Sequence, residues 1–333
     1  MSASQRRSPM RTLLALALTL TLAAPAAAQE VKIRFAGNLP PANSNSRAME
    51  VFKQEVEKRS GGTMKVDVFP AMQLGGAKDN LDQVKSGTLQ AAYLSTAFMT
   101  GYVAKLGVFN LPFVFKDRET AFKVLDGPIG KELEREMERA GFKNLGFWEN
   151  GWRHMTNSKR AIATPDDLSG LKIRLQNNSV HLRTFKLLGA NPVPMDIKEV
   201  YSAMQQGVID GHENPYCNTL NLKFYEVQKY LSVSGHFYDL MGAIMNKRFY
   251  DGLGKDRQAI VDQASRAATE FQRKQAAEDD LKCLDQLKQK GMQVNTMSPA
   301  ALATFRATTL PVYKEFEKEL TKELIDRFAA ANK

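Results

Sequence analysis

Apolar and polar residues alternate in short runs along the first third of the chain, and stretches with helical spacing separate these runs. In the first helical stretch, Met49, Phe52 and Val56 recur at the interval of one helix face. The order is β-α-β-α-β, which predicts a mainly parallel sheet covered by helices. The expected strands are 31–35, 63–69 and 90–94, and the expected helices are 46–59 and 77–86.

The rest of the chain continues this mixture, and one helical stretch, 255–290, is unusually long and free of proline and glycine. Asp196 is expected to cap a helix that ends near Gln206. At roughly 150 residues per domain the length suggests two domains. No Pro/Gly-rich linker joins the two domains, so the chain is expected to cross between them several times. The long helix is expected to be part of both domains. Further strands are expected at 145–148, 171–175, 208–211, 229–234 and 240–245, and further helices at 117–125, 129–140, 179–188, 298–307 and 311–330.

The composition is that of an ordinary soluble globular protein, with 43% hydrophobic and 25% charged residues. This excludes a disordered chain and a multi-span membrane protein. The net charge is +10, but residues 255–290 mix both signs, as a solvated helix face does. The charge therefore favours attraction of small anions, and we expect no nucleic-acid partner.

The first 28 residues have the pattern of a secretory signal peptide. Arg6, Arg7 and Arg11 precede an apolar run at 13–22, and small residues at 26–28 offer a cleavage site. The apolar run is too short to span a bilayer comfortably, although an uncleaved anchor is the alternative. We therefore expect residues 29–333 to be exported to the periplasm.

Metal and cofactor chemistry has no support in the sequence. The four histidines show no ligand spacing, no phosphate- or dinucleotide-binding glycine pattern is present, and no nucleophile motif occurs. Export permits one disulfide between Cys217 and Cys283, but we expect two free, partly buried thiols. The sequence thus predicts no metal ion, no cofactor and no enzyme.

Three side chains can donate hydrogen bonds to a small anion. Arg174 ends a buried-type strand, where a side chain of a parallel sheet faces the ligand crevice. Its planar guanidinium can hold a carboxylate through two bonds, which lysine cannot do. Arg153 and Asn214 are the other two donors. The alternatives are a surface charge for Arg174 and a helix N-cap role for Asn214, with Pro215 at the first helical position.

Ordered blocks of residues give the chain a resemblance to the DctP-type solute-binding proteins of tripartite ATP-independent periplasmic (TRAP) transporters. Each block alone is weak evidence for this family, whereas the order and spacing of all the blocks over residues 31–325 are specific for it. The blocks are Phe69-Pro-x-x-Gln-Leu-Gly75, Gly151-x-Arg-x-x-Thr-Asn157, Asp167-Leu-x-Gly-Leu-Lys-x-Arg174, Gly189-Ala-x-Pro-x-Pro-Met195, Glu199-Val-Tyr201, Asp210-Gly-x-Glu-Asn-Pro215 and Phe224-Tyr-Glu-Val-Gln-Lys-Tyr230.

The resemblance implies an α/β fold of two lobes, a periplasmic-binding-protein clamshell that closes on an organic anion. Each lobe would be a sheet flanked by helices, and the long helix would span both lobes. We expect lobe 1 to comprise residues 29–151 and about 240–279, and lobe 2 to comprise 152–239 and about 280–333.

The resemblance also assigns site residues. Arg174 would make the principal bidentate bond to a ligand carboxylate, assisted by Arg153 and Asn214, while the first lobe would contribute polar side chains. Trp148 and His236 are further candidates. The alternatives are that Trp148 is a core residue and that His236 is a histidine whose hydrogen bonds are made within the protein. The full set of candidate ligand-binding residues is Asn38, Ser44, Ser95, Trp148, Arg153, Arg174, Ile197, Asn214 and His236.

The ligand class is only partly constrained. Sialic-acid-binding relatives use acidic side chains where this chain has Gly76 or Ala77, and Ser95, which disfavours that ligand. The leading expectation is a C4-dicarboxylate, and sugar acids, hydroxy or keto monocarboxylates and aromatic acids are the alternatives. The expected partners are the ligand and the TRAP membrane permease, with the protein itself a monomer. A periplasmic enzyme acting on an acidic small molecule and a sensor that presents its ligand to a receptor are the competing functions.

Overall fold

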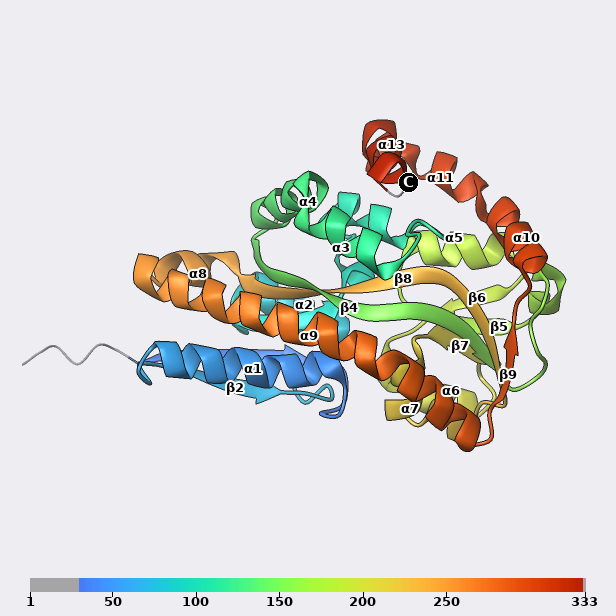
Figure 1. The fold of residues 1–333 in the computed structure, drawn as a ribbon, viewed down its shortest axis with the longest axis horizontal. Helices are drawn as coiled ribbons and strands as arrows, with labels where there is room; N and C mark the ends of the chain where they lie inside the picture. Colours follow the sequence, from blue (N-terminus) through green and yellow to red (C-terminus); the bar gives the residue numbers. More distant parts are fainter. Residues whose placement is uncertain (1–29, 332–333) are drawn as a thin grey trace, which may run out of the picture.

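The computed structural model describes residues 30–331, so the predicted signal peptide at 1–28 lies outside the described residues. Strands and helices alternate along the chain, and the helices lie on both faces of a twisted sheet (Figure 1). The strands are β1 (Val31–Gly37), β2 (Met64–Phe69), β3 (Ala91–Ser95), β4 (Phe142–Asn157), β5 (Lys172–Leu175), β6 (Asn191–Pro194), β7 (Gly211–Asn214), β8 (Tyr230–Asn246) and β9 (Gln293–Thr296).

The helices predicted from apolar spacing are present with small shifts at their ends. The full set of α-helices within residues 30–331 is α1 (Ser44–Arg59), α2 (Ala77–Ser86), α3 (Arg118–Asp126), α4 (Pro128–Arg139), α5 (Ser179–Leu187), α6 (Ile197–Gln205), α7 (Tyr216–Asn221), α8 (Lys247–Gly252), α9 (Lys255–Gln289), α10 (Pro299–Thr309), α11 (Pro311–Glu315), α12 (Glu317–Leu320) and α13 (Lys322–Ala331). Two of these, the short helices α7 and α8, were not predicted. The single helix expected at 311–330 is wrong, because the chain breaks into α11, α12 and α13, with Thr321 in the left-handed region at φ 65°.

Within residues 30–331 the nine strands form one mixed sheet in the order β2-β1-β3-β8-β4-β7-β5-β6, with β9 paired to β8. The pairs β1–β2 and β1–β3 are parallel, as the β-α-β-α-β pattern predicted. Both faces are covered: Ala91 and Tyr93 of β3 pack with α1 and α9, while Ala92 and Leu94 pack in a second apolar cluster on the opposite face. Every residue of β3 is therefore buried, which is typical of a sheet covered on both sides.

The antiparallel pair β4–β8 runs through the middle of the sheet and is much longer than predicted. The strand expected at 145–148 extends over 16 residues, and the two strands expected at 229–234 and 240–245 are one strand of 17 residues. Irregular pairing breaks the apolar alternation of β4, including a register shift next to Gly151, which has φ 117°. Bulges of this kind hide a long strand from a search for strict alternation.

Three shorter strands, β6, β7 and β9, also differ from expectation. The strand predicted at 208–211 lies at Gly211–Asn214 instead. Strand β6 was not predicted because it contains Pro192 and Pro194, and proline is tolerated in it because β6 lies at the edge of the sheet. Strand β9 is short and half-buried, so it carries little apolar signal.

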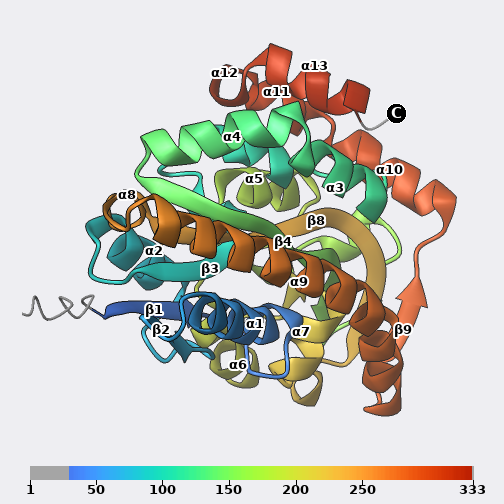
Figure 2. The same ribbon diagram turned by 60° about the vertical axis from the view of Figure 1, so that its left-hand side comes forward.

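Helix α9 is 35 residues long and crosses the molecule from the α1 side to β9 (Figure 2). It packs against α1, β4 and α7. At its contact with α7, Cys217 and Cys283 form a disulfide, so the expectation of two free thiols is wrong. The two cysteines are 66 residues apart in sequence, and only the packing of α7 on α9 brings their Cα atoms to 5.1 Å.

The C-terminal helices return to the first part of the chain. Their apolar residues Val312, Phe316, Leu320 and Phe328 join the cluster that α2, α3 and α4 build on one face of the sheet. The lobe boundaries predicted from sequence stay a prediction, and this packing favours moving 312–328 from lobe 2 to lobe 1. Among residues 30–331, no helix combines the length and apolarity needed to cross a bilayer.

Candidate functional site

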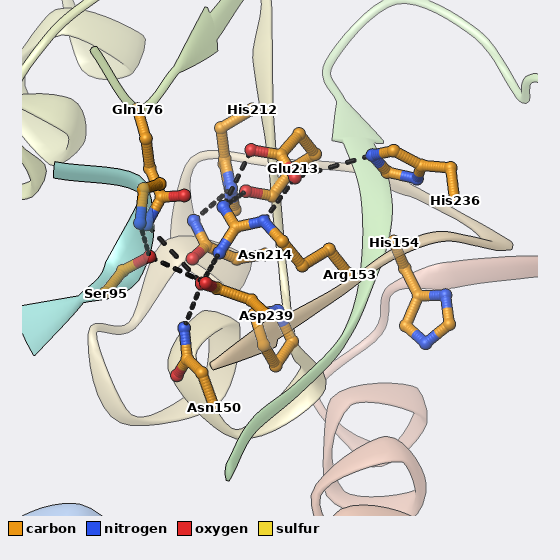
Figure 3. Close-up of polar contacts among 12 residues, drawn as sticks. Ser95, Asn150, Arg153, His154, Gln176, His212, Glu213, Asn214, His236 and Asp239 are labelled. Carbon is orange, nitrogen blue, oxygen red and sulfur yellow. Dashed lines mark hydrogen bonds and ion pairs between the residues drawn. The ribbon is translucent and has the colours of Figure 1, made fainter. Parts of the chain in front are cut away.

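Arg153 lies in a buried cluster of charged side chains at the centre of the sheet (Figure 3). Its Nη2 donates to Glu213 Oε1 at 2.7 Å, its Nε also pairs with Glu213, and its Nη1 donates to Asp239 Oδ2 at 2.7 Å. The three residues come from the neighbouring strands β4, β7 and β8. Burial acts to raise the pKa of Glu213, but the Arg153 charge and the hydrogen bonds of Arg153 and His236 together outweigh burial, so the pKa lies well below its usual value. Arg153 is therefore paired with two carboxylates, which carry one more negative charge than Arg153 alone can neutralise.

Asp239 is the meeting point of donors from several elements. Besides Arg153, it accepts hydrogen bonds from Ser95 Oγ at 2.6 Å, from Asn150 Nδ2 at 2.7 Å and from Gln176 Nε2 at 3.4 Å. Ser95 ends β3, Asn150 lies within β4 and Gln176 directly follows β5. A single carboxylate thus ties both halves of the sheet together at their centre.

Arg174 is equally buried but has a different environment. Its Nε and Nη2 donate to the carbonyl oxygen of Met195 at 2.8 and 2.6 Å. Among the described residues, no carboxylate lies within ion-pair distance of its guanidinium. Burial, together with the Arg153 charge, lowers the pKa of Arg174 to about 10, which still leaves the group charged at neutral pH. Arg174 is therefore a buried cation whose counter-ion is missing.

His212 and Asn214 lie beside Arg174 on the adjacent strand β7. Asn214 Nδ2 lies 3.0 Å from His212 Nδ1, which leaves the buried His212 Nε2 without a hydrogen-bond partner among the described residues. Burial and then the Arg174 charge lower the pKa of His212 to about 3, so the ring is neutral. The alternative that Asn214 caps a helix is wrong, because Asn214 ends β7 and Pro215 itself occupies the N-cap position of α7.

Ser95 and His236, two of the predicted site residues, lie in the cluster around Arg153. Ser95 contacts Asp239 directly, and His236 Nε2 lies 3.4 Å from Glu213 Oε2. The other ring nitrogen of His236 bonds Ser234 Oγ at 2.7 Å. Asn38 is buried at the end of β1, and its Oδ1 has no partner among residues 30–331.

The other three predicted residues lie apart from this cluster. Trp148 packs against Phe35 and Tyr93 in an apolar cluster, and its Nε1 donates to Thr269 Oγ1 at 3.0 Å. Ile197 belongs to a separate apolar cluster at the start of α6. Ser44 begins α1, and its Oγ accepts a hydrogen bond from Gln272 of α9 at 3.2 Å. Their surroundings in the structure are those of core and packing residues.

Sequence reasoning missed Glu213, Asp239, Asn150 and Gln176 as members of the site. A usable signal exists for Asp239, which is a single charge within the apolar run 237–241. Glu213 stands in the middle of a four-residue strand that is buried throughout. A charge in a buried strand needs a partner, and that requirement points to an ion-pair cluster.

Comparisons with known proteins show which family the chain resembles. Residues 35–319 match the family described as bacterial extracellular solute-binding protein, family 7 (DctP). The chain is 40% identical over 285 residues to a solute-binding protein of Verminephrobacter eiseniae, which covers 85% of this chain and 84% of that protein.

Two solved structures show the same fold with different ligands. The sugar acid binding protein DctPAm from Advenella mimigardefordensis, in complex with galactonate, has a TM-score of 0.89 and 34% identity, covering 91% of this chain and 98% of that one. A TRAP periplasmic solute-binding protein from Sulfurospirillum deleyianum with bound succinate has a TM-score of 0.88 and 34% identity, covering 91% and 99%.

These relatives are periplasmic binding proteins that serve transport and are not enzymes. Their family as a whole takes both dicarboxylates and sugar acids. The match extends over most of the chain, from β1 to α12. The chain therefore belongs to the DctP family of bacterial extracellular solute-binding proteins, the solute-binding proteins of TRAP transporters.

Proposed function

We propose that this protein captures a small organic acid by its carboxylate on Arg174 and delivers it to a TRAP membrane permease. The buried, unpaired guanidinium of Arg174 is the observation that carries this proposal. A buried cation without a counter-ion is costly, and a ligand carboxylate removes that cost. Charge-assisted bonds of about 1.5–3 kcal/mol each supply much of the roughly 8 kcal/mol that micromolar binding requires.

The decisive variant is Arg174→Lys, which keeps the charge and loses the planar pair of donors. An acid is first identified by thermal shift of residues 29–333 against a panel of organic acids, and its Kd is then measured by calorimetry. We expect the Kd to rise at least tenfold in Arg174→Lys. The control is Arg183→Lys, which alters an exposed arginine paired with Glu315. Equal affinity in Arg174→Lys and the control contradicts the proposal.

The proposal also covers export of the protein to the periplasm and its oligomeric state. We expect cleavage after residue 28, release into the periplasm and a monomer in solution. Mass spectrometry of protein recovered from the periplasm checks the new N-terminus, and light scattering checks the molecular mass. We also expect the two lobes to close on the ligand by hinge motion, so small-angle scattering should differ with and without ligand.

A further inference from the structure

We infer that Asp239 and Gln176 make this site select a hydroxylated monocarboxylate and reject a second carboxylate. The inference rests on the proposed capture of one carboxylate by Arg174. It favours the sugar-acid and hydroxy-acid alternatives over the C4-dicarboxylate that the sequence placed first. Two observations support it, one concerning charge and the other concerning hydrogen bonds.

The buried charges of the site already balance before any ligand enters. Arg153 and Arg174 supply two positive charges, and Glu213 and Asp239 supply two negative charges. Most of the hydrogen-bonding capacity of Arg153 is used by its two carboxylate partners. One ligand carboxylate on Arg174 therefore leaves the group of charges with a net charge of −1.

No other buried cation of the described site is available for a second carboxylate. The histidines His154, His181 and His212 are neutral, because burial lowers the pKa of each to about 3, and burial also lowers the pKa of His236. The further charge that acts on Arg174 is Asp196, which is also negative. A dianion would bring its second charge toward Asp239 and Glu213 in a region of low dielectric constant, where like charges repel strongly.

The unpaired hydrogen-bonding atoms of the site include two acceptors. The amide of Gln176 has a defined orientation, because its Nε2 faces the Asp239 carboxylate at 3.4 Å and the reverse orientation would place oxygen against oxygen (Figure 3). This leaves Gln176 Oε1 buried and without a partner, and Asn38 Oδ1 is in the same situation. Buried acceptors require donors. A ligand hydroxyl supplies a donor, whereas succinate at neutral pH has none.

The test uses two pairs of probes with matched chain length. The first pair is D-erythronate and succinate, which both have four carbons. The second pair is galactonate and galactarate, which differ in the second carboxylate and share the other hydroxyls. Calorimetry at pH 7.5 should show the monocarboxylate binding at least tenfold more tightly than the dicarboxylate in the pair whose length the site accepts.

Two variants separate the charge effect from the hydrogen-bond effect. Asp239→Asn removes one negative charge with little change of shape. The ratio of the galactarate Kd to the galactonate Kd should therefore fall at least tenfold in this variant. Gln176→Met removes the free acceptor without changing charge, so it should weaken galactonate at least fivefold while changing succinate less than twofold. The control is Asp285→Asn, which removes a carboxylate from an exposed site. Gln176→Met keeps the inference testable if Asp239→Asn fails to fold.

The possible failures are distinguishable. If the dicarboxylate binds the wild-type protein as tightly as the monocarboxylate in the pair whose length the site accepts, the inference is overturned, and a loss of that binding in Arg174→Lys leaves the proposed function standing. If neither variant changes the preference, Asp239 and Gln176 are not its determinants and the inference is also overturned. If no acid of either class binds, the proposed function falls together with the inference.

Discussion

Arg174 donates two hydrogen bonds, from Nε and Nη2, to the same carbonyl oxygen, that of Met195. Met195 directly follows β6, which pairs in parallel with the strand of Arg174. These two bonds fix the plane of the guanidinium while leaving its remaining nitrogen Nη1 without a hydrogen-bond partner among residues 30–331. Arg174 is thus oriented by the backbone and not neutralised by it, as a carboxylate receptor requires.

Substitution of the two buried arginines should destabilise the fold to different extents. Arg153→Met leaves Glu213 and Asp239 buried without their cation, so we expect the free energy of unfolding to fall by about 3–5 kcal/mol. Arg174→Met removes a cation that has no carboxylate partner, so a loss of only about 1 kcal/mol is expected, together with loss of ligand binding. Urea unfolding of both variants measures the difference. Equal destabilisation would contradict the assignment of Arg174 as the unpaired cation.

The Cys217–Cys283 disulfide should stabilise the fold without affecting the ligand site. It links α7 to α9 across 66 residues of sequence, for which loop-closure entropy predicts a contribution of about 4 kcal/mol. We therefore expect dithiothreitol, or replacement of both cysteines by serine, to lower the urea midpoint while the ligand Kd stays within twofold. An unchanged midpoint after verified reduction would show that the bridge adds nothing to stability.

Gly76 provides the space for a carboxylate shared by two helices. Asp196 accepts hydrogen bonds from the backbone of Lys198, at the start of α6, and of Ala77, at the start of α2, each at 3.1 Å. A Cβ atom on Gly76 would lie 2.4 Å from Asp196 Oδ2. Under the proposed closure this contact forms only in the closed state, so Gly76→Ala should weaken ligand binding about tenfold.

The matched control for Gly76→Ala is Gly252→Ala, because an added Cβ at Gly252 meets no atom within 4 Å. Calorimetry on both variants isolates the clash from the general effect of replacing glycine by alanine. If Gly76→Ala binds ligand as tightly as Gly252→Ala, the contact between Asp196 and α2 does not contribute to closure.

Acid should destabilise the protein well before its carboxylates titrate. Burial lowers the pKa of His154, His181 and His212 to about 3, whereas an unfolded histidine titrates near 6.5. Between these values the unfolded state binds more protons, so stability is complete above about pH 6.5 and falls as the pH decreases. Each histidine should cost about 2 kcal/mol between pH 7 and pH 5.

Urea unfolding at pH 7 and pH 5 measures this loss. The variant His181→Phe keeps the ring stacking on Phe237, whose centroid lies 4.1 Å away, and removes one proton-binding group. It should reduce the difference between the two pH values by about 2 kcal/mol. Equal stability of the wild-type protein at pH 7 and pH 5 would contradict the neutral, buried state of these rings.

The sequence by itself determined the features that depend on local patterns. Apolar spacing located α1 to α6 and α9, including the full length of α9, but missed the short α7 and α8. Alternation located β1 and β2, and a short apolar run located β3. The ordered blocks around Arg153, Arg174 and Asn214 identified the family, which the comparisons confirm. These predictions succeeded because helix periodicity, helix ends and family motifs are written in residues close together in the chain.

Only the tertiary structure decided which charges are paired and which are free. Arg153 and Arg174 have the same chemistry in sequence, yet strand order places Glu213 and Asp239 beside Arg153 and a backbone carbonyl beside Arg174. The Cys217–Cys283 bridge likewise depends on the packing of two helices. Such contacts join residues tens of positions apart, so their partners follow from sheet register and helix packing, which no local pattern specifies.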